Sequence, residues 1–447
     1  MDITLLNMNN ISQKGVPLGS LYLTSFLESK GFSVDFRDYQ LNSFKDPYDP
    51  KKFVSFMKNS SDVIGISVSD ELLPFVLLCL RELKAKFPEK KIILGGPGVA
   101  GVEENLLKNF NEADIIARGE GELTIVDLLD SLQKEKDLRY VKGIFFKDKG
   151  NVAFTGPRKR IVDLDELPFP ACHKIKLKKY NFNSLMTSRG CRFNCTFCNN
   201  CAFWSHQITA RSPDNVIEEI KLIASKSKKC IRFNDDNFLF DRKRVLSICE
   251  KIKKEKLDVD CGFSANLNCM DSKLMKKLIG SGFITVLYGV ESASDKILRR
   301  INKPFNFALA DKVIKKSADQ FKLTFISFIW GFPFESVEDL KKSVFYMNAY
   351  KYFFKERVSV HLSLLSPVPL SALYFEFKHL LRFSGKFIHY ANNDTMLNEC
   401  NQKTKKEIMH LIKKFPLVFP DFYYYSHKGI YDKQEIVASL SQKRFKP

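Results

Sequence analysis

Short apolar segments alternate with helix-like segments in two separate blocks of this chain, which limits its fold to the α/β class. In the first block, the predicted strands are Asp2–Leu6, Phe32–Phe36, Asp62–Val68, Lys91–Leu94 and Ala113–Ala117. Helices are predicted at Leu18–Lys30, at Leu77–Phe87 and from Leu123 onward. This order favours a doubly wound, Rossmann-like sheet whose strands are parallel.

Ligands bind to such sheets beyond the carboxyl ends of the strands. The loops expected there are Ser67-Val68-Ser69, Gly95-Gly96-Pro97-Gly98 and Arg118-Gly119-Glu120-Gly121-Glu122. Tight turns account for most glycines of this kind. The loops are nevertheless small enough to admit a ligand, so this edge is a candidate binding site.

The second block, from about residue 183 to 370, contains six further strand candidates. They are Ser184–Ser188, Cys230–Asn234, Val259–Ser264, Ile284–Val290, Leu323–Trp330 and Val358–Leu364. Ser212 followed by Pro213 predicts one helix start, and Asp271 predicts another. Six strand–helix units fit a partial, TIM-like (β/α)6 barrel, whose site is expected at the carboxyl ends of its strands.

The two blocks imply a division of the chain into four segments. Residues 1–145 form the first domain and residues 146–182 a linker, because Asp163 to Pro170 is acidic and contains two prolines. Residues 183–374 form the barrel. Beyond Tyr374 the pattern weakens, and residues 375–447 are expected to be a mostly helical C-terminal extension that covers the barrel mouth.

Composition narrows the class of protein. The chain has 447 residues, a formal net charge of +20 and eleven cysteines. Its longest apolar run, Leu72–Leu80, is too short to span a membrane, and the N-terminus lacks a secretory signal pattern, so a cytoplasmic location is expected. No Arg-rich or aromatic-basic stripe accompanies the positive charge, so nucleic acid is not an expected partner.

Four of the eleven cysteines lie between Cys191 and Cys201, and clustered cytoplasmic cysteines more often hold metal than form disulfides. Cys191, Cys195 and Cys198 have the spacing C-x3-C-x2-C. Three thiolates on one short loop can ligate three irons of a [4Fe–4S] cluster. The fourth iron is then open to a chelating small molecule. Cys201 remains an alternative fourth ligand, which would close the cluster.

This motif, after a strand that opens a partial barrel, resembles the radical S-adenosylmethionine (SAM) superfamily. The resemblance implies that the open iron binds SAM. One-electron reduction then yields methionine and a 5′-deoxyadenosyl radical, which abstracts hydrogen from the substrate. The resemblance places Phe197 near the adenine, Asp235 and Asp236 near the amino group, and Glu291 at the ribose hydroxyls.

Further segments carry the same resemblance. Tyr288 to Ser294, which includes Gly289, Glu291 and Ser292, is similar to the family segment after the fourth strand. Trp330-Gly331-Phe332-Pro333 and Ser366-Pro367-Val368-Pro369-Leu370 resemble the loops after the fifth and sixth strands. Phe334 departs from the pattern, since relatives often have glycine there.

The first domain resembles the cobalamin-binding domain of the B12-dependent branch of this superfamily. The segments Pro17 to Leu23, Gly95 to Gly98, Gly119 to Glu122 and Leu164 to Pro170 carry the resemblance. It implies that cobalamin contacts Ser67, Ser69, Gly95, Gly96, Gly98 and Glu120. The usual lower-ligand motif D-x-H-x-x-G is absent, because the first histidine is His173. A domain that keeps the fold without the cofactor is the alternative.

The expected function is cobalamin-dependent methylation of an unactivated carbon in a small-molecule or natural-product substrate. Flavodoxin or ferredoxin is the expected electron donor. Cyclisation or rearrangement without methyl transfer is the first alternative. A tRNA methylthiotransferase is less favoured, because only Cys79 lies before residue 150 and a second cluster needs three cysteines there. A non-catalytic iron–sulfur scaffold is the remaining alternative. The catalytic residues stay unknown at this level.

Overall fold

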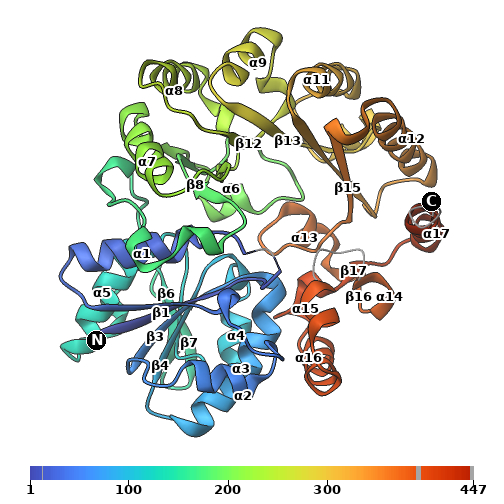
Figure 1. Cartoon of the computed structure of the whole chain (residues 1–447). Helices are drawn as coiled ribbons and strands as arrows, with labels where there is room; N and C mark the ends of the chain where they lie inside the picture. Colours follow the sequence, from blue (N-terminus) through green and yellow to red (C-terminus); the bar gives the residue numbers. More distant parts are fainter. Residues whose placement is uncertain (13, 389–393, 443–447) are drawn as a thin grey trace. The chain divides into compact units, whose positions relative to one another are not determined.

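The computed structural model describes residues 1–12, 14–388 and 394–442 (Figure 1). The chain forms two compact units. The first comprises Met1–Ser184 and Asn392–Phe422, and the second comprises Leu185–Ala391 and Tyr423–Pro447. The α/β class, with a Rossmann-like N-terminal part and a partial barrel, is confirmed. The division into four segments stays a prediction.

The first unit is built on a seven-stranded sheet with the order β2-β1-β3-β4-β5-β6-β7. Its strands are β1 (Ile3–Met8), β2 (Val34–Asp38), β3 (Val63–Val68), β4 (Lys91–Gly95), β5 (Ile115–Ala117), β6 (Ile144–Asp148) and β7 (Asn151–Phe154). The first five strands are parallel, as predicted. The antiparallel β6–β7 hairpin was not predicted. Its turn contains Lys149 and Gly150, both with positive φ, which is the geometry of a tight hairpin.

Five helices of the first unit follow or connect these strands: α1 (Leu18–Ser29), α2 (Pro50–Phe56), α3 (Leu73–Lys86), α4 (Glu103–Asn109) and α5 (Gly121–Gln133). Helix α3 begins four residues before the predicted start. The short helices α2 and α4 were not predicted. From the C-terminal extension, α15 (Asp394–Glu399) and α16 (Gln402–Lys414) also belong to this unit. Just after α16, Phe415 packs against Phe110, with ring centroids 4.9 Å apart.

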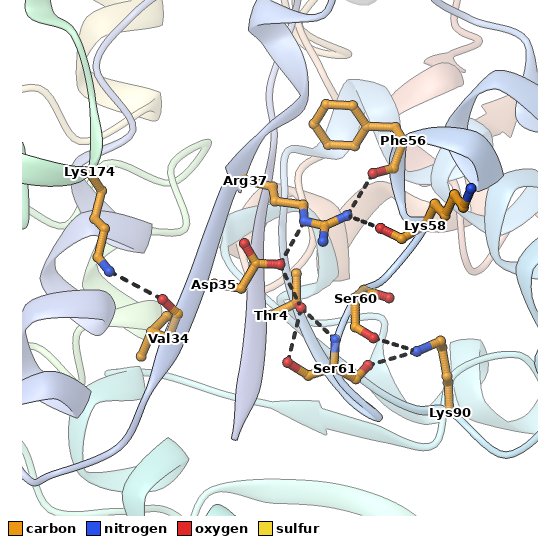
Figure 2. A network of polar contacts seen from close by, with 10 residues as sticks. All are labelled: Thr4, Val34, Asp35, Arg37, Phe56, Lys58, Ser60, Ser61, Lys90 and Lys174. Carbon is orange, nitrogen blue, oxygen red and sulfur yellow. Dashed lines mark hydrogen bonds and ion pairs between the residues drawn. The ribbon is translucent and has the colours of Figure 1, made fainter. Parts of the chain in front are cut away.

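The amino ends of β1, β2, β3 and β4 are tied together by polar contacts within the protein (Figure 2). Thr4 donates to Asp35 at 3.1 Å and accepts from the backbone N–H of Ser61 at 2.8 Å. Arg37 donates to Asp35 at 2.7 Å, and Lys90 donates to the backbone carbonyl of Ser60 at 2.8 Å. The protein's own groups therefore satisfy the amino edge, and ligands of such sheets bind at the opposite, carboxyl edge.

The second unit is built on a six-stranded sheet with the open order β15-β14-β13-β12-β11-β8. Its strands are β8 (Asn183–Leu185), β11 (Ile231–Phe233), β12 (Cys261–Ala265), β13 (Phe283–Glu291), β14 (Leu323–Trp330) and β15 (Val358–Leu364). All six predicted strands are present, and the pairs from β11 to β15 are parallel. An open sheet of six strands is the expected partial barrel.

Helices cover the outside of this sheet (Figure 1). They are α7 (Pro213–Lys226), α8 (Arg242–Lys254), α9 (Ser272–Ile279), α11 (Phe307–Gln320) and α12 (Val337–Phe354). Both predicted helix starts are confirmed. Ser212 accepts a hydrogen bond from the backbone N–H of Asn215, and Asp271 accepts one from that of Leu274. The core between sheet and helices is rich in phenylalanine, including Phe233 and Phe283.

The remaining C-terminal elements of the second unit are α13 (Ala372–Phe377), β16 (Leu381–Arg382), α14 (Gly385–Ile388), β17 (Tyr424–Tyr425) and α17 (Ile430–Gln442). The extension is mostly helical, as predicted, although β16 and β17 form a short antiparallel pair. Residues 389–393 and 443–447, where that prediction also falls, lie outside the described residues. Within the described residues, no helix is both long enough and apolar enough to cross a membrane.

Candidate functional site

The three motif cysteines lie on a loop at the carboxyl edge of the second unit's sheet. The loop runs from β9 (Ser188–Arg189) to α6 (Asn200–Phe203), and Cys191, Cys195 and Cys198 are all partly buried on it. Gly190 opens the loop with a φ of +99°, and a Cβ there would lie 2.2 Å from the carbonyl oxygen of Gln207. Only glycine fits this turn.

Burial raises the pKa of the Cys191 thiol to about 11 and that of the Cys198 thiol to about 12. The negative charges of Asp236 and of neighbouring thiolates add to both shifts. Iron would reverse these shifts, because a coordinated cation stabilises the thiolate. Among the described residues, no group of three or more His, Cys, Asp or Glu side chains lies close enough to hold a single metal ion. A [4Fe–4S] cluster does not need its ligands to meet at one point, because each thiolate binds a different iron.

The Cys201 thiol contacts the backbone of the loop. It is buried, and its partners are the backbone carbonyls of Cys191, at 3.4 Å, and of Phe193. The thiol thus braces the inside of the loop. This geometry supports three ligands rather than four, and the assignment of Cys191, Cys195 and Cys198 stays a prediction.

Asp235 and Asp236 follow β11 and accept hydrogen bonds from the segments at the two ends of the cysteine loop. Asp235 is 3% exposed and accepts hydrogen bonds from Thr187 N–H at 2.7 Å, Thr187 hydroxyl at 2.5 Å and Ser188 hydroxyl at 2.6 Å. Asp236 accepts from the Gly190 N–H at 3.2 Å and from the Asn200 amide at 2.8 Å. Both predicted SAM contacts therefore have a structural task, and contact with SAM stays a prediction for each.

Glu291 ends β13 at a bulge, with a φ of +70°. The residue is 6% exposed. Its Oε1 accepts a hydrogen bond from Lys303 Nζ at 2.9 Å, whereas its Oε2 has no hydrogen-bond partner among the described residues. A glutamate whose backbone is in the left-handed region is strained, and a buried carboxylate oxygen without a donor is unfavourable. Both features are concentrated at functional sites.

Gly289 and Phe197, two more of the predicted SAM residues, lie near Lys303. The backbone carbonyl of Gly289 accepts from Lys303 at 2.9 Å, and a Cβ on Gly289 would lie 2.3 Å from Glu291 Oε1. A side chain at this position would therefore displace the Glu291 carboxylate. The ring of Phe197 lies 5.4 Å from Lys303 Nζ. Ser292 is fully buried, and its hydroxyl accepts from the backbone of Ser294 at 3.1 Å, within its own turn.

In the first unit, the predicted cobalamin residues lie at the carboxyl edge of the sheet. The turn at Gly96 and Gly98 packs directly on the end of β3 and on the loop that follows it. A Cβ on Gly96 would lie 3.0 Å from Ser67 Oγ, and one on Gly98 would lie 2.4 Å from the carbonyl carbon of Ser69. These glycines thus allow two loops to touch. A Cβ on Gly95 would meet nothing closer than 3.9 Å, and Ser69 Oγ is buried without a partner among the described residues.

Glu120 binds the linker. Its carboxylate accepts hydrogen bonds from the Ile161 N–H at 2.8 Å and from Arg160 at 3.4 Å. This contact explains the residue without a ligand, and its role toward cobalamin stays a prediction.

Sequence reasoning did not identify Lys303, although its side chain contacts three of the predicted SAM residues. It lies twelve residues beyond Glu291 and outside the motif segments, so no local pattern marks it. The sequence offers one weak indication of Lys303, which is its position shortly after the helix that follows the fourth strand.

Comparisons with known proteins agree with this architecture. The sequence model described as the radical SAM superfamily matches residues 185–347, and that of the B12 binding domain matches residues 5–129. The uncharacterized methyltransferase PH0819 of Pyrococcus horikoshii is 30% identical over 348 residues, which are 75% of this chain and 73% of that protein.

Two further curated relatives differ in their named activities. Cytidylyl-2-hydroxyethylphosphonate methyltransferase of Streptomyces wedmorensis is 25% identical over 74% of this chain and 72% of that protein. The anaerobic magnesium-protoporphyrin IX monomethyl ester cyclase of Rubrivivax gelatinosus is 25% identical over 73% of this chain and 61% of that protein.

Solved structures share the fold over 98% of the chain. The radical SAM methyltransferase TsrM from Kitasatospora setae, with cobalamin and a [4Fe–4S] cluster bound, has a TM-score of 0.75 and 15% identity. The match covers 98% of this chain and 88% of TsrM. The cobalamin-dependent SAM radical enzyme OxsB, with aqua-cobalamin and SAM bound, has a TM-score of 0.69 and 17% identity, over 98% of this chain and 66% of OxsB.

Proposed function

Because the chain belongs to the radical SAM superfamily, in the branch that carries a B12 binding domain, we propose that it methylates an unactivated carbon of a small-molecule substrate. The cofactors of this branch are a [4Fe–4S] cluster, SAM and cobalamin. When bound, they supply a radical that activates the substrate and a methyl group that replaces its hydrogen. The residues of the chain bind and orient these groups.

The cysteine loop fits an iron–sulfur cluster with one open iron. Cys191, Cys195 and Cys198 supply three thiols from one loop, and Cys201 is engaged with backbone carbonyls. Asp235 and Asp236 fix the loop from the neighbouring strand. Three thiolates on a loop held in this way leave the fourth iron for the amino and carboxylate groups of SAM.

The observation that carries the proposal is the unsatisfied Oε2 of Glu291. An unpaired acceptor in a buried position costs about 1–3 kcal/mol, so the fold tolerates it where a ligand supplies the donor. The ribose hydroxyls of SAM are suitable donors. Lys303, which contacts this same carboxylate, also contacts Phe197 in the cysteine loop, so the acceptor lies beside the proposed cluster.

Two features of the carboxyl edge of the first unit's sheet are compatible with a flat macrocycle such as cobalamin. Ser69 offers a buried hydroxyl without a partner among the described residues, and Gly95 leaves space above the sheet. The first histidine of the sequence is His173, which lies beyond the sheet strands and forms an ion pair with Glu28. Cobalamin bound here would therefore lack a histidine ligand from the domain.

We expect the substrate to be a small molecule. The names of two relatives include a phosphonate and a porphyrin ester, which illustrates the range of such substrates. The electron donor would be an acidic flavodoxin or ferredoxin, because the net charge of +20 attracts an anionic partner. Ring closure without methyl transfer is a second candidate, since three of the relatives are named as cyclases.

The test uses the full chain, reconstituted anaerobically with iron, sulfide and hydroxocobalamin and given SAM labelled in its methyl group. We expect iron and cobalt to bind, reduction to release 5′-deoxyadenosine, and the label to appear in methylcobalamin. Spectra of the Co(II) state should show no histidine nitrogen. A chain that carries Ala at all three motif cysteines is the control for cleavage. Cleavage without label on cobalt would favour the cyclase, and absence of both cleavage and cobalt would refute the proposal.

A further inference from the structure

A turn between two helices is fastened to the cysteine loop. It follows α10 (Asp295–Arg300), and its Ile301 carbonyl accepts a hydrogen bond from the backbone N–H of Thr196 at 3.2 Å. The side-chain amide of Asn302 donates to the carbonyl of Asn194 at 2.8 Å. These two bonds hold the next residue, Lys303, against the loop that carries Cys195 and Cys198.

The side chain of Lys303 is only 7% exposed. Its ammonium donates to the Gly289 carbonyl and to Glu291 Oε1, both at 2.9 Å, and lies 5.4 Å from the centroid of the Phe197 ring. A buried ammonium needs a partner of opposite charge, and the Glu291 carboxylate supplies one at 2.9 Å. The ammonium therefore stays charged inside the unit.

We propose that Lys303 is a positioning residue that couples the Glu291 carboxylate to the iron–sulfur cluster. It holds Glu291 Oε1, so that Oε2 is left for the ribose of SAM, and its positive charge favours the reduced state of the cluster. This inference rests on the proposed function. It adds Lys303 to the proposed SAM site as a residue that acts through Glu291 and the cluster.

The electrostatic part follows from the sign of the charges. Reduction adds one negative charge to the cluster, and a fixed cation nearby stabilises that charge in a medium of low dielectric constant. Removal of the lysine should therefore lower the reduction potential, and removal of the glutamate charge should raise it.

The experiment compares Lys303→Met, Lys303→Arg and Glu291→Gln with the wild-type chain after reconstitution. Lys312→Met is the matched control, because Lys312 is an exposed lysine on the neighbouring helix α11. The measurements are iron content, the midpoint potential of the cluster by redox titration with electron paramagnetic resonance, and the dissociation constant of SAM.

We expect Lys303→Met to keep its iron, to shift the midpoint potential to more negative values and to weaken SAM binding about tenfold. Lys303→Arg should restore much of the potential, because it keeps the charge. Glu291→Gln should shift the potential in the opposite direction. If Lys303→Met does not assemble a cluster, the double variant Lys303→Met/Glu291→Gln removes both buried charges and keeps the test available.

A midpoint potential and a SAM affinity of Lys303→Met equal to those of Lys312→Met would overturn the inference. Shifts of the same sign for Lys303→Met and Glu291→Gln would also overturn it, since a loss of packing alone would produce that result. The proposed function is judged separately, from SAM cleavage and methylcobalamin formation by the wild-type chain. Wild-type turnover with an unshifted Lys303→Met therefore refutes the inference and leaves the function standing.

Discussion

Replacement of Asp235 by alanine should destabilise the second unit strongly. The carboxylate is 3% exposed and accepts three hydrogen bonds, from the N–H and hydroxyl of Thr187 and from the hydroxyl of Ser188. Hydrogen bonds to a charged group contribute about 1.5–3 kcal/mol each. Their partners stay buried after the replacement, so a total loss of about 3–5 kcal/mol is expected once non-additivity is allowed for.

The assay is thermal unfolding of the iron-free chain, followed by circular dichroism. For a unit of this size, about 1 kcal/mol corresponds to a change of about 2–4 °C in Tm, so Asp235→Ala should lower the relevant transition by roughly 10 °C. Asp235→Asn should lower it less, because the amide keeps one acceptor and the two hydroxyls can reorient. Asp258→Ala, at an exposed aspartate of the same unit, is the control.

An Asp235→Ala chain that melts together with the Asp258→Ala control would refute this reasoning. If that chain kept its stability and its cluster but lost affinity for SAM, Asp235 would be the SAM ligand that its sequence position predicts. The two readouts therefore separate a residue that holds the cysteine loop from one that contacts the cofactor.

Four shorter predictions follow from other parts of the chain. Cys201→Ala should retain the iron content of the wild type, whereas Ala at any of the three motif cysteines should abolish it. Glu291→Ala should weaken SAM binding by about 1–3 kcal/mol in calorimetry while iron content is unchanged. Gly98→Val should unfold the first unit in circular dichroism and prevent cobalt uptake, because its Cβ would overlap the backbone of the facing loop, whereas Gly95→Ala should do neither. Burial raises the pKa of Glu71 to about 7, so the stability of the first unit should fall as the pH rises from about 4.5 to about 7, and Glu71→Gln should regain on the order of 1–3 kcal/mol at pH 8 and nothing at pH 4.

Local features of the chain were predictable from the sequence because they depend on neighbours a few residues apart. Strand and helix periodicity located the parallel strands of both units, and capping chemistry located the helix starts at Ser212 and Asp271. The cysteine spacing is likewise local, so the loop proposed to hold the cluster was found directly. The β6–β7 hairpin was missed, because its two-residue turn contains a lysine where glycine or asparagine is the usual signal.

The tertiary structure alone decided what the candidate residues touch. Asp235 meets Thr187 across 48 residues of chain, and Gly98 meets the loop at Ser69 rather than an open site. Lys303 reaches Glu291 only because the turn after α10 docks on the cysteine loop. Contacts between distant segments depend on how the strands are ordered and how the loops above them pack. Periodicity and spacing carry no information about such contacts, so the sequence located the loops of the site, whereas their partners emerged only from the folded chain.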